Sequence, residues 1–253
     1  MGRHCRAVWR ILRGLWHLLL GLYVLLACFP RLSPEQREMQ VQAWALKLLA
    51  LWGIHLQVWG QPVACGPALL VANHISWLDI LVIHAARFCR FVSKADVGRW
   101  PLIGTLATGA GTLYIERSRR RDALRMVHDM AKSLREGDVL AVFPEGTTSD
   151  GAQVLAFHAN LIESAIAAGA PVQPLALRYA DARTGQASQA PAYIDDDSLL
   201  GSIWRTLTAE PMVAVVHFGL PEQANGRDRR QWAGDLRQTV DRLRCEEKGV
   251  SVH

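Results

Sequence analysis

The sequence predicts an α/β fold, an αβ sandwich around a mixed, largely parallel sheet, with a helical hairpin at the N-terminus. Apolar runs of strand length alternate with helix-length segments along most of the chain, as in folds whose helices cover a sheet. The chain has 253 residues, half of them hydrophobic and a fifth charged, which is enough for one main core. We divide it into a hairpin, residues 1–53, and a globular domain, residues 54–253.

The first segment of the hairpin is an apolar run, residues 14–29, interrupted only by His17 and preceded by four arginines. Crossing a bilayer takes about 20 apolar residues. The run is therefore slightly short, unless residues 8–12 join it and the side chains of Arg10 and Arg13 reach the lipid headgroups. A cleaved secretory signal is disfavoured, because residues 29–31 read FPR where small residues are required.

A second apolar helix completes the hairpin. Ser33 and Pro34 form a typical helix start, and Gly53 is a typical helix end. Two adjacent apolar helices after a basic start predict a membrane-attaching hairpin on the arginine-rich face of the bilayer, which is the cytoplasmic face. The alternative is a buried helical cap on a soluble core.

The globular domain alternates between strands and helices. Apolar stretches bounded by turn residues predict strands at 55–59, 68–72, 88–92, 112–115, 138–143, 172–179 and 212–218. Helical periodicity predicts helices at 76–87, 97–108, 119–136, 155–168 and 228–247. The helix at 119–136 is amphipathic, with a predicted inner side of Ala123, Leu124, Met126, Val127, Met130 and Leu134.

Charge and cysteine content exclude some classes of protein. The 28 basic and 23 acidic residues give a net charge of +5, which favours anionic partners. Only the net charge favours a nucleic-acid binder, because the sequence has no recognisable nucleic-acid-binding motif. The five cysteines have no paired spacing, which argues against a disulfide framework, a zinc site or an oxidising compartment.

Three chemically useful residues follow predicted strands. His74 comes just after the strand at 68–72, Arg117 after the strand at 112–115, and Glu145 after the strand at 138–143. Ligands bind beyond the carboxyl ends of strands in such sheets, so we expect these residues to line one cleft. On a regular helix His74 and Asp79 would point about 140° apart. A working pair therefore needs His74 in the turn before the helix.

Four segments then resemble, in order, the motifs of the 1-acylglycerol-3-phosphate acyltransferase family of glycerolipid acyltransferases. They are NHISWLD at 73–79, GTLYIER at 111–117, FPEGT at 143–147 and APVQP at 170–174. The resemblance implies transfer of a fatty acyl group from acyl-CoA or acyl carrier protein to the free hydroxyl of 1-acyl-glycerol-3-phosphate (lysophosphatidic acid), giving phosphatidic acid. It implies no cofactor beyond the thioester co-substrate, and the partners are the bilayer, the lysolipid acceptor and the acyl donor.

The resemblance also assigns roles to residues of the four motifs. His74 and Asp79 are the expected catalytic residues, with His74 as the general base and Asp79 holding its ring. Because the sequence has no G-x-S-x-G motif, direct attack by the acceptor hydroxyl is preferred to an acyl-enzyme. Acceptor binding is expected from Arg117, Glu145, Gly146 and Thr147. We expect Arg117 to bind the phosphate, Glu145 to orient Arg117 or a hydroxyl, and Gly146 to allow close backbone approach.

One position departs from the family pattern. Thr148 follows FPEGT where many members have arginine, so one expected cation is absent from the acceptor site. The sequence favours lysophosphatidic acid as the acceptor, with lyso-ornithine lipid or another lysophospholipid as the alternative. A noncatalytic membrane-binding protein is the alternative from another class. Acyl-chain preference and oligomeric state are not encoded in these motifs.

Overall fold

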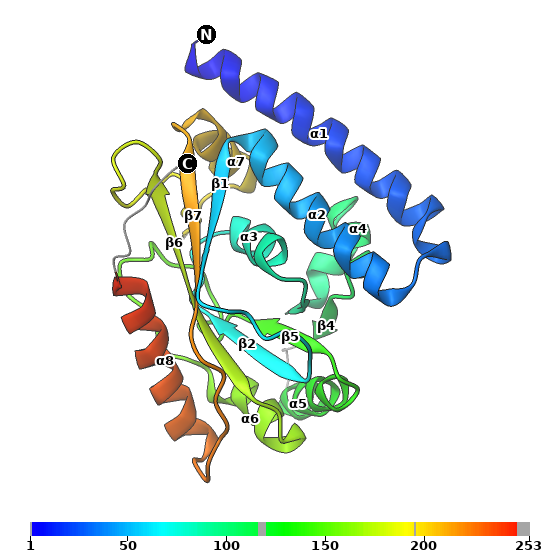
Figure 1. Ribbon diagram of the computed structural model, residues 1–253, viewed down its shortest axis with the longest axis vertical. Helices are drawn as coiled ribbons and strands as arrows, with labels where there is room; N and C mark the ends of the chain where they lie inside the picture. The colour runs from blue at the N-terminus through cyan, green and yellow to red at the C-terminus, as the bar shows by residue number, and fades with distance from the viewer. Residues whose placement is uncertain (1, 116–119, 195, 247–253) are drawn as a thin grey trace.

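A computed structural model of the protein describes residues 2–115, 120–194 and 196–246 (Figure 1). Its sheet has the strand order β1-β7-β6-β2-β5-β3-β4. Neighbouring strands are parallel except for β6 and β7, which are antiparallel. The strands are β1 Ile54–Trp59, β2 Ala68–Ala72, β3 Arg90–Lys94, β4 Leu113–Ile115, β5 Val139–Val142, β6 Val172–Asp181 and β7 Met212–Phe218. The predicted mixed, largely parallel sheet is therefore confirmed.

Helices cover both faces of this sheet (Figure 1), so the predicted αβ sandwich is confirmed. The helices are α1 Arg3–Ala27, α2 Pro34–Trp52, α3 Leu78–Ala86, α4 Ile103–Gly109, α5 Arg120–Arg135, α6 Ala159–Ala168, α7 Leu199–Thr208 and α8 Arg229–Cys245, with short 3-10 turns at η1 Phe29–Arg31 and η2 Ala95–Arg99. Residues of α2 and α3 share one hydrophobic core with the sheet, and residues of α5, α6 and α8 share the other. Burial on both faces explains why the central strands read as continuous apolar runs.

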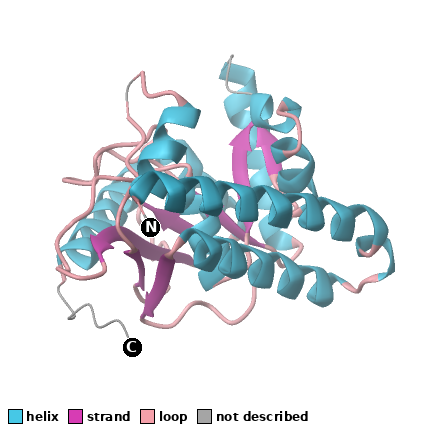
Figure 2. Cartoon of the chain, turned by 90° about the horizontal axis from the view of Figure 1, so that it is seen from above, coloured by secondary structure: helices cyan, strands magenta, loops and turns pink. Residues whose placement is uncertain are grey.

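The predicted hairpin is present, and its two helices lie side by side (Figures 1 and 2). Two glycines of α1 let the helices approach closely. A Cβ atom on Gly14 would lie 2.5 Å from Nε1 of Trp52, and one on Gly21 would lie 2.3 Å from Nε1 of Trp44. His17 stacks on Trp44 at a ring distance of 5.3 Å. Small residues at seven-residue spacing thus form the inner face of α1.

The outer face of α1 is apolar and exposed. Its exposed side chains are Val8, Trp9, Leu12, Leu15, Trp16, Leu19, Leu20, Tyr23 and Leu26. Among the described residues, α1 is the one helix long and apolar enough to cross a membrane. The division of the chain at residue 53 stays a prediction; Ala45 and Leu49 of α2 lie in the main hydrophobic core.

Arg10 does not extend away from the protein, as it would have to if residues 8–12 lengthened the apolar run across a bilayer. It is 7% exposed, and its guanidinium donates to the backbone carbonyls of Leu207 and Ala209 at 2.9 and 3.1 Å. These carbonyls belong to the C-terminal end of α7, where a helix leaves carbonyls without partners. This contact was not predicted, because α7, a short helix containing Gly201, was not recognised in the sequence. Arg10 therefore joins the hairpin to the globular domain.

Several predicted bounds were also wrong. The helix at 97–108 is divided into η2 and α4, because Pro101 disfavours helical geometry at Trp100. The strand expected at 88–92 is shifted to Arg90–Lys94. Leu124 is 72% exposed rather than buried, since it lies about 200° around α5 from the buried Met126. The helix expected from residue 155 begins at Ala159.

Candidate active site

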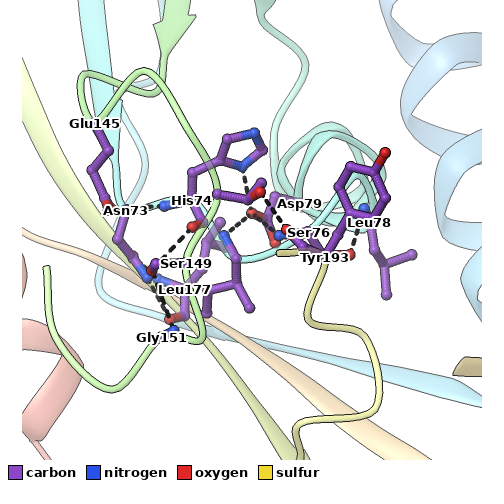
Figure 3. Close-up of polar contacts among 12 residues, drawn as sticks. Asn73, His74, Ser76, Leu78, Asp79, Glu145, Ser149, Gly151, Leu177 and Tyr193 are labelled. Atoms are coloured by element: carbon purple, nitrogen blue, oxygen red, sulfur yellow. Dashed lines mark hydrogen bonds and ion pairs between the residues drawn. The ribbon is translucent and has the colours of Figure 1, made fainter. Parts of the chain in front are cut away.

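His74 lies in the turn between β2 and α3, and Asp79 lies in the first turn of α3. The His74 Nδ1 atom is 2.8 Å from Oδ2 of Asp79 (Figure 3). The Asp79 side chain is fully buried, whereas the His74 side chain is 18% exposed. The turn geometry required by their spacing in the sequence is therefore present.

The Asp79 carboxylate is held by further donors. Its Oδ2 accepts from the backbone N–H groups of Ile75 and Ser76 at 2.6 and 2.9 Å. Its Oδ1 accepts from the Tyr179 hydroxyl at 2.6 Å. Because a buried carboxylate is costly unless hydrogen bonds satisfy it, these donors satisfy Asp79 and fix its orientation.

The Nδ1 contact leaves the other ring nitrogen of His74 available. Within the described part of the chain, Nε2 of His74 has no hydrogen-bond partner, and it points away from Asp79 (Figure 3). The ring stacks on Phe143 with centroids 3.9 Å apart and planes 7° from parallel. A neutral His74 that donates from Nδ1 to Asp79 has a free lone pair on Nε2. The arrangement can accept a proton from a nearby hydroxyl.

The side chain of Glu145 anchors the His74 turn by binding a backbone N–H group of that turn. Glu145 is 5% exposed, and its two oxygens accept from the backbone N–H groups of His74 at 2.9 Å and Leu155 at 3.2 Å. The expectation that Glu145 orients a hydroxyl finds no such partner among the described residues. Arg117, the other expected partner, lies outside the described residues. Leu155, which was predicted to begin a helix, lies before α6 and gives its N–H group to this bond.

Gly146 and Thr147 occupy the tight turn after β5. Gly146 has a φ of 73°, a left-handed conformation that favours glycine. A Cβ atom there would lie 2.9 Å from the His158 ring, and the Gly146 N–H donates to the Phe143 carbonyl at 3.1 Å. The His158 ring therefore occupies the space that a side chain at position 146 would need, and the approach of the acceptor to the Gly146 backbone stays a prediction. Thr147 is exposed beside it.

Three neighbouring residues of the site were not predicted. Ser149 donates its backbone N–H to the His74 carbonyl at 2.9 Å, and Tyr193 donates its backbone N–H to the Ile75 carbonyl at 3.0 Å. Tyr179, at the end of a predicted strand, carried the only sequence signal, because a buried tyrosine hydroxyl needs a partner. Asn73, considered either a turn or a site residue, exchanges two hydrogen bonds with the Leu177 backbone and so joins β2 to β6.

Among the described residues, no group of three or more His, Cys, Asp or Glu side chains lies close enough together to hold a metal ion. The electrostatics of the site come from buried carboxylates instead. Burial raises the pKa of Glu145, and the two backbone N–H bonds oppose this increase only in part. A carboxylate suits this buried position because its two oxygens accept from two backbone N–H groups at once.

Replacing Glu145 with glutamine tests this role. Glutamine keeps the shape but places an N–H group opposite a backbone N–H, so the His74 turn loses one anchor. We expect kcat to fall about tenfold, the effect of one unsatisfied buried donor. Because the folded-state pKa of Glu145 is raised, wild-type stability declines as pH rises through that pKa. The melting temperature of Glu145→Gln, measured relative to that of wild type, should therefore increase as the pH rises above about 4.5.

The matched control is Glu136→Gln, at the exposed end of α5. It should leave both kcat and the pH dependence of melting unchanged. Wild-type kcat in Glu145→Gln would show that the turn does not need this anchor.

Comparison with known proteins identifies the family. A family model described as Acyltransferase matches residues 55–178. The lyso-ornithine lipid O-acyltransferase of Pseudomonas aeruginosa is 37% identical over 204 residues, which cover 81% of this chain and 78% of the relative. The 1-acyl-sn-glycerol-3-phosphate acyltransferase of Neisseria gonorrhoeae is 33% identical over 222 residues, covering 87% and 86%.

A solved structure shows the same fold. The crystal structure of the 1-acyl-sn-glycerophosphate acyltransferase PlsC from Thermotoga maritima matches with a TM-score of 0.68 at 18% identity, covering 95% of this chain and all of that one. The matching segment of the sequence includes both His74 and Glu145. On the similarity to its relatives, this chain belongs to the acyltransferase family and is an acyltransferase.

Proposed function

We propose that the protein transfers a fatty acyl group from acyl-CoA or acyl carrier protein to the free hydroxyl of a lysolipid, with His74 as the general base. The observation that carries this proposal is the contact of His74 Nδ1 with buried Asp79, which leaves Nε2 without a partner among the residues that the structure describes. Membership of the acyltransferase family supports the reaction class. It also argues against a noncatalytic membrane-binding protein.

The chemistry is a direct transfer. The acceptor oxygen attacks the thioester carbonyl carbon while its proton passes to Nε2 of His74. The tetrahedral intermediate then collapses, the C–S bond breaks, and the imidazolium returns the proton to the leaving sulfur. An ester and a free thiol result. Asp79 stabilises the imidazolium between these two steps, as the aspartate does in catalytic triads.

Position 148 supports a choice between acceptors. The Thr148 hydroxyl donates to the Tyr193 carbonyl, so this side chain braces the neighbouring loop and brings no positive charge. A phosphate monoester gains more from a cation at the acceptor site than a headgroup that carries its own amine. Thr148 therefore favours lyso-ornithine lipid, the substrate named for the Pseudomonas relative. Lysophosphatidic acid is the second candidate, supported by Arg117 and by the Neisseria relative.

The exposed face of α1 supports attachment to a membrane surface. Its inner face packs on α2, and Arg6 and Arg10 join it to the segment that follows α7. A helix fixed along one side to the protein is suited to lie in the interface with its other side in lipid. The exposed Arg3 and Arg13 of α1 favour the anionic cytoplasmic leaflet.

Replacing His74 with alanine tests the catalytic proposal. Loss of a general base should lower kcat by about 10²- to 10⁴-fold, measured as thiol release from acyl-CoA or acyl carrier protein with acceptor present. His55→Ala, which changes an exposed histidine on β1, is the control and should keep wild-type activity. If His74→Ala kept a tenth of the activity, the assignment would be wrong. Fatty acid release without acceptor would instead indicate a thioesterase.

An acceptor panel with the purified enzyme tests the choice of lysolipid. At equal acyl donor, we expect kcat/KM for lyso-ornithine lipid to exceed that for lysophosphatidic acid. Thr148→Arg should shift the ratio toward lysophosphatidic acid, because the new cation can pair with the phosphate. Exclusive acylation of lysophosphatidic acid by wild type would reverse the preferred acceptor.

Substitution of both Trp9 and Trp16 with serine tests membrane attachment. These side chains are 55% and 71% exposed, and inserting them into lipid buries large aromatic surfaces. The double variant should bind vesicles of anionic phospholipid about tenfold more weakly or worse in a flotation assay. Leu124→Ser, at an equally exposed site on α5, should float like wild type. Equal flotation of all three proteins would contradict the proposal.

A further inference from the structure

Tyr179 lies at the end of β6, and its ring is part of the core between the sheet and α3. It is 3% exposed, and its hydroxyl donates to Oδ1 of Asp79 at 2.6 Å. We propose that Tyr179 is a positioning residue of the reaction, which holds the Asp79 carboxylate so that Oδ2 faces His74. The proposal rests on the proposed function of His74 as the base.

The two oxygens of Asp79 have different partners. Oδ2 accepts from the His74 ring and from the backbone N–H groups of Ile75 and Ser76. Among the described residues, Oδ1 has the Tyr179 hydroxyl as its one partner. A rotation of the carboxylate away from this plane would stretch the bonds at both oxygens. The hydroxyl therefore fixes the plane of the carboxylate, with one oxygen directed at the imidazole.

The backbone places Tyr179 accurately. Leu177, two residues earlier on the same face of β6, exchanges hydrogen bonds with the Asn73 side chain at 2.7 and 3.1 Å. Asn73 immediately precedes His74, so the Tyr179 strand and the His74 turn are joined directly. A tyrosine ring is rigid, with two side-chain torsions, and reaches from this strand to α3 without flexible atoms.

Tyr179 stays a donor across the range of enzyme assays. Complete burial raises the pKa of its hydroxyl well above the ordinary value, and the adjacent Asp79 charge raises it further. The titratable groups that face this cluster are Asp79 on α3, His74 in the turn and Glu145 after β5. Only a protonated hydroxyl can donate to the carboxylate beside it.

The hydroxyl also moderates the charge that His74 meets. Its O–H dipole points at the carboxylate and offsets part of the negative potential at the imidazole. Without it, the imidazolium is held more strongly, and a higher pH is needed to free the base. This electrostatic effect separates a positioning role from a purely structural one.

Tyr179→Phe tests the proposal, since phenylalanine keeps the ring and removes only the oxygen. We expect kcat to fall about tenfold while KM for donor and acceptor stays within about twofold. The acidic limb of the kcat/KM profile should move to higher pH. Ser164→Ala removes a buried hydroxyl from α6, whose bond is to the Leu161 carbonyl, and should change neither quantity.

A second measurement keeps the test decisive. In an Asp79→Asn background, adding Tyr179→Phe should cause little further loss, because both changes act through the same carboxylate. Wild-type kcat and pH profile in folded Tyr179→Phe would overturn the proposal. The proposal would also be overturned if Tyr179→Phe lowered kcat by the same factor at every pH, and equally in wild type and in Asp79→Asn. High activity in His74→Ala would instead overturn the proposed function itself.

Discussion

The buried carboxylate of Asp79 is the constraint on which the site depends. A carboxylate without access to water must be fully hydrogen-bonded or it becomes costly to keep ionised. Its donors come from the His74 ring, the turn that follows β2 and the end of β6. Satisfying one charge thus fixes a turn, a helix start and a neighbouring strand with respect to one another. The orientation of the His74 ring follows from this arrangement.

The loop after β5 completes the arrangement from the other side. β2 and β5 are parallel neighbours, so their carboxyl ends meet at one edge of the sheet. Glu145 accepts from the His74 N–H, and Ser149 donates to the His74 carbonyl. The backbone of the histidine is therefore held at both of its polar atoms by one loop. Residues far apart in the sequence serve the same turn because the sheet places them together.

The hydrophobic pattern of the sequence predicted those elements whose ends are set by neighbouring residues in the chain. The strands at 68–72 and 212–218 were predicted at their exact ends, since each is an apolar run bounded by turn residues. Helix geometry predicted that His74 must lie in the turn before the helix to contact Asp79, and the resemblance to the acyltransferase motifs paired the two residues. The backbone role of Glu145 and the buried position of Arg10 were missed, because each depends on a tertiary partner. Their charges suggested a ligand or lipid, whereas backbone groups of the protein satisfy them.

The hairpin and the His74 turn are connected by tryptophans. Gly14 of α1 leaves room for Trp52 of α2, whose ring meets Trp77 edge to face at 5.7 Å. Trp77 lies between His74 and Asp79 in the sequence, and its Nε1 donates to Ser202 of α7 at 3.1 Å. The helix with the exposed apolar face is thus connected to the His74 turn through two aromatic side chains. An acceptor whose acyl chain stays in the bilayer needs its hydroxyl near the membrane surface, and a hairpin packed directly on the His74 turn is suited to meet that requirement.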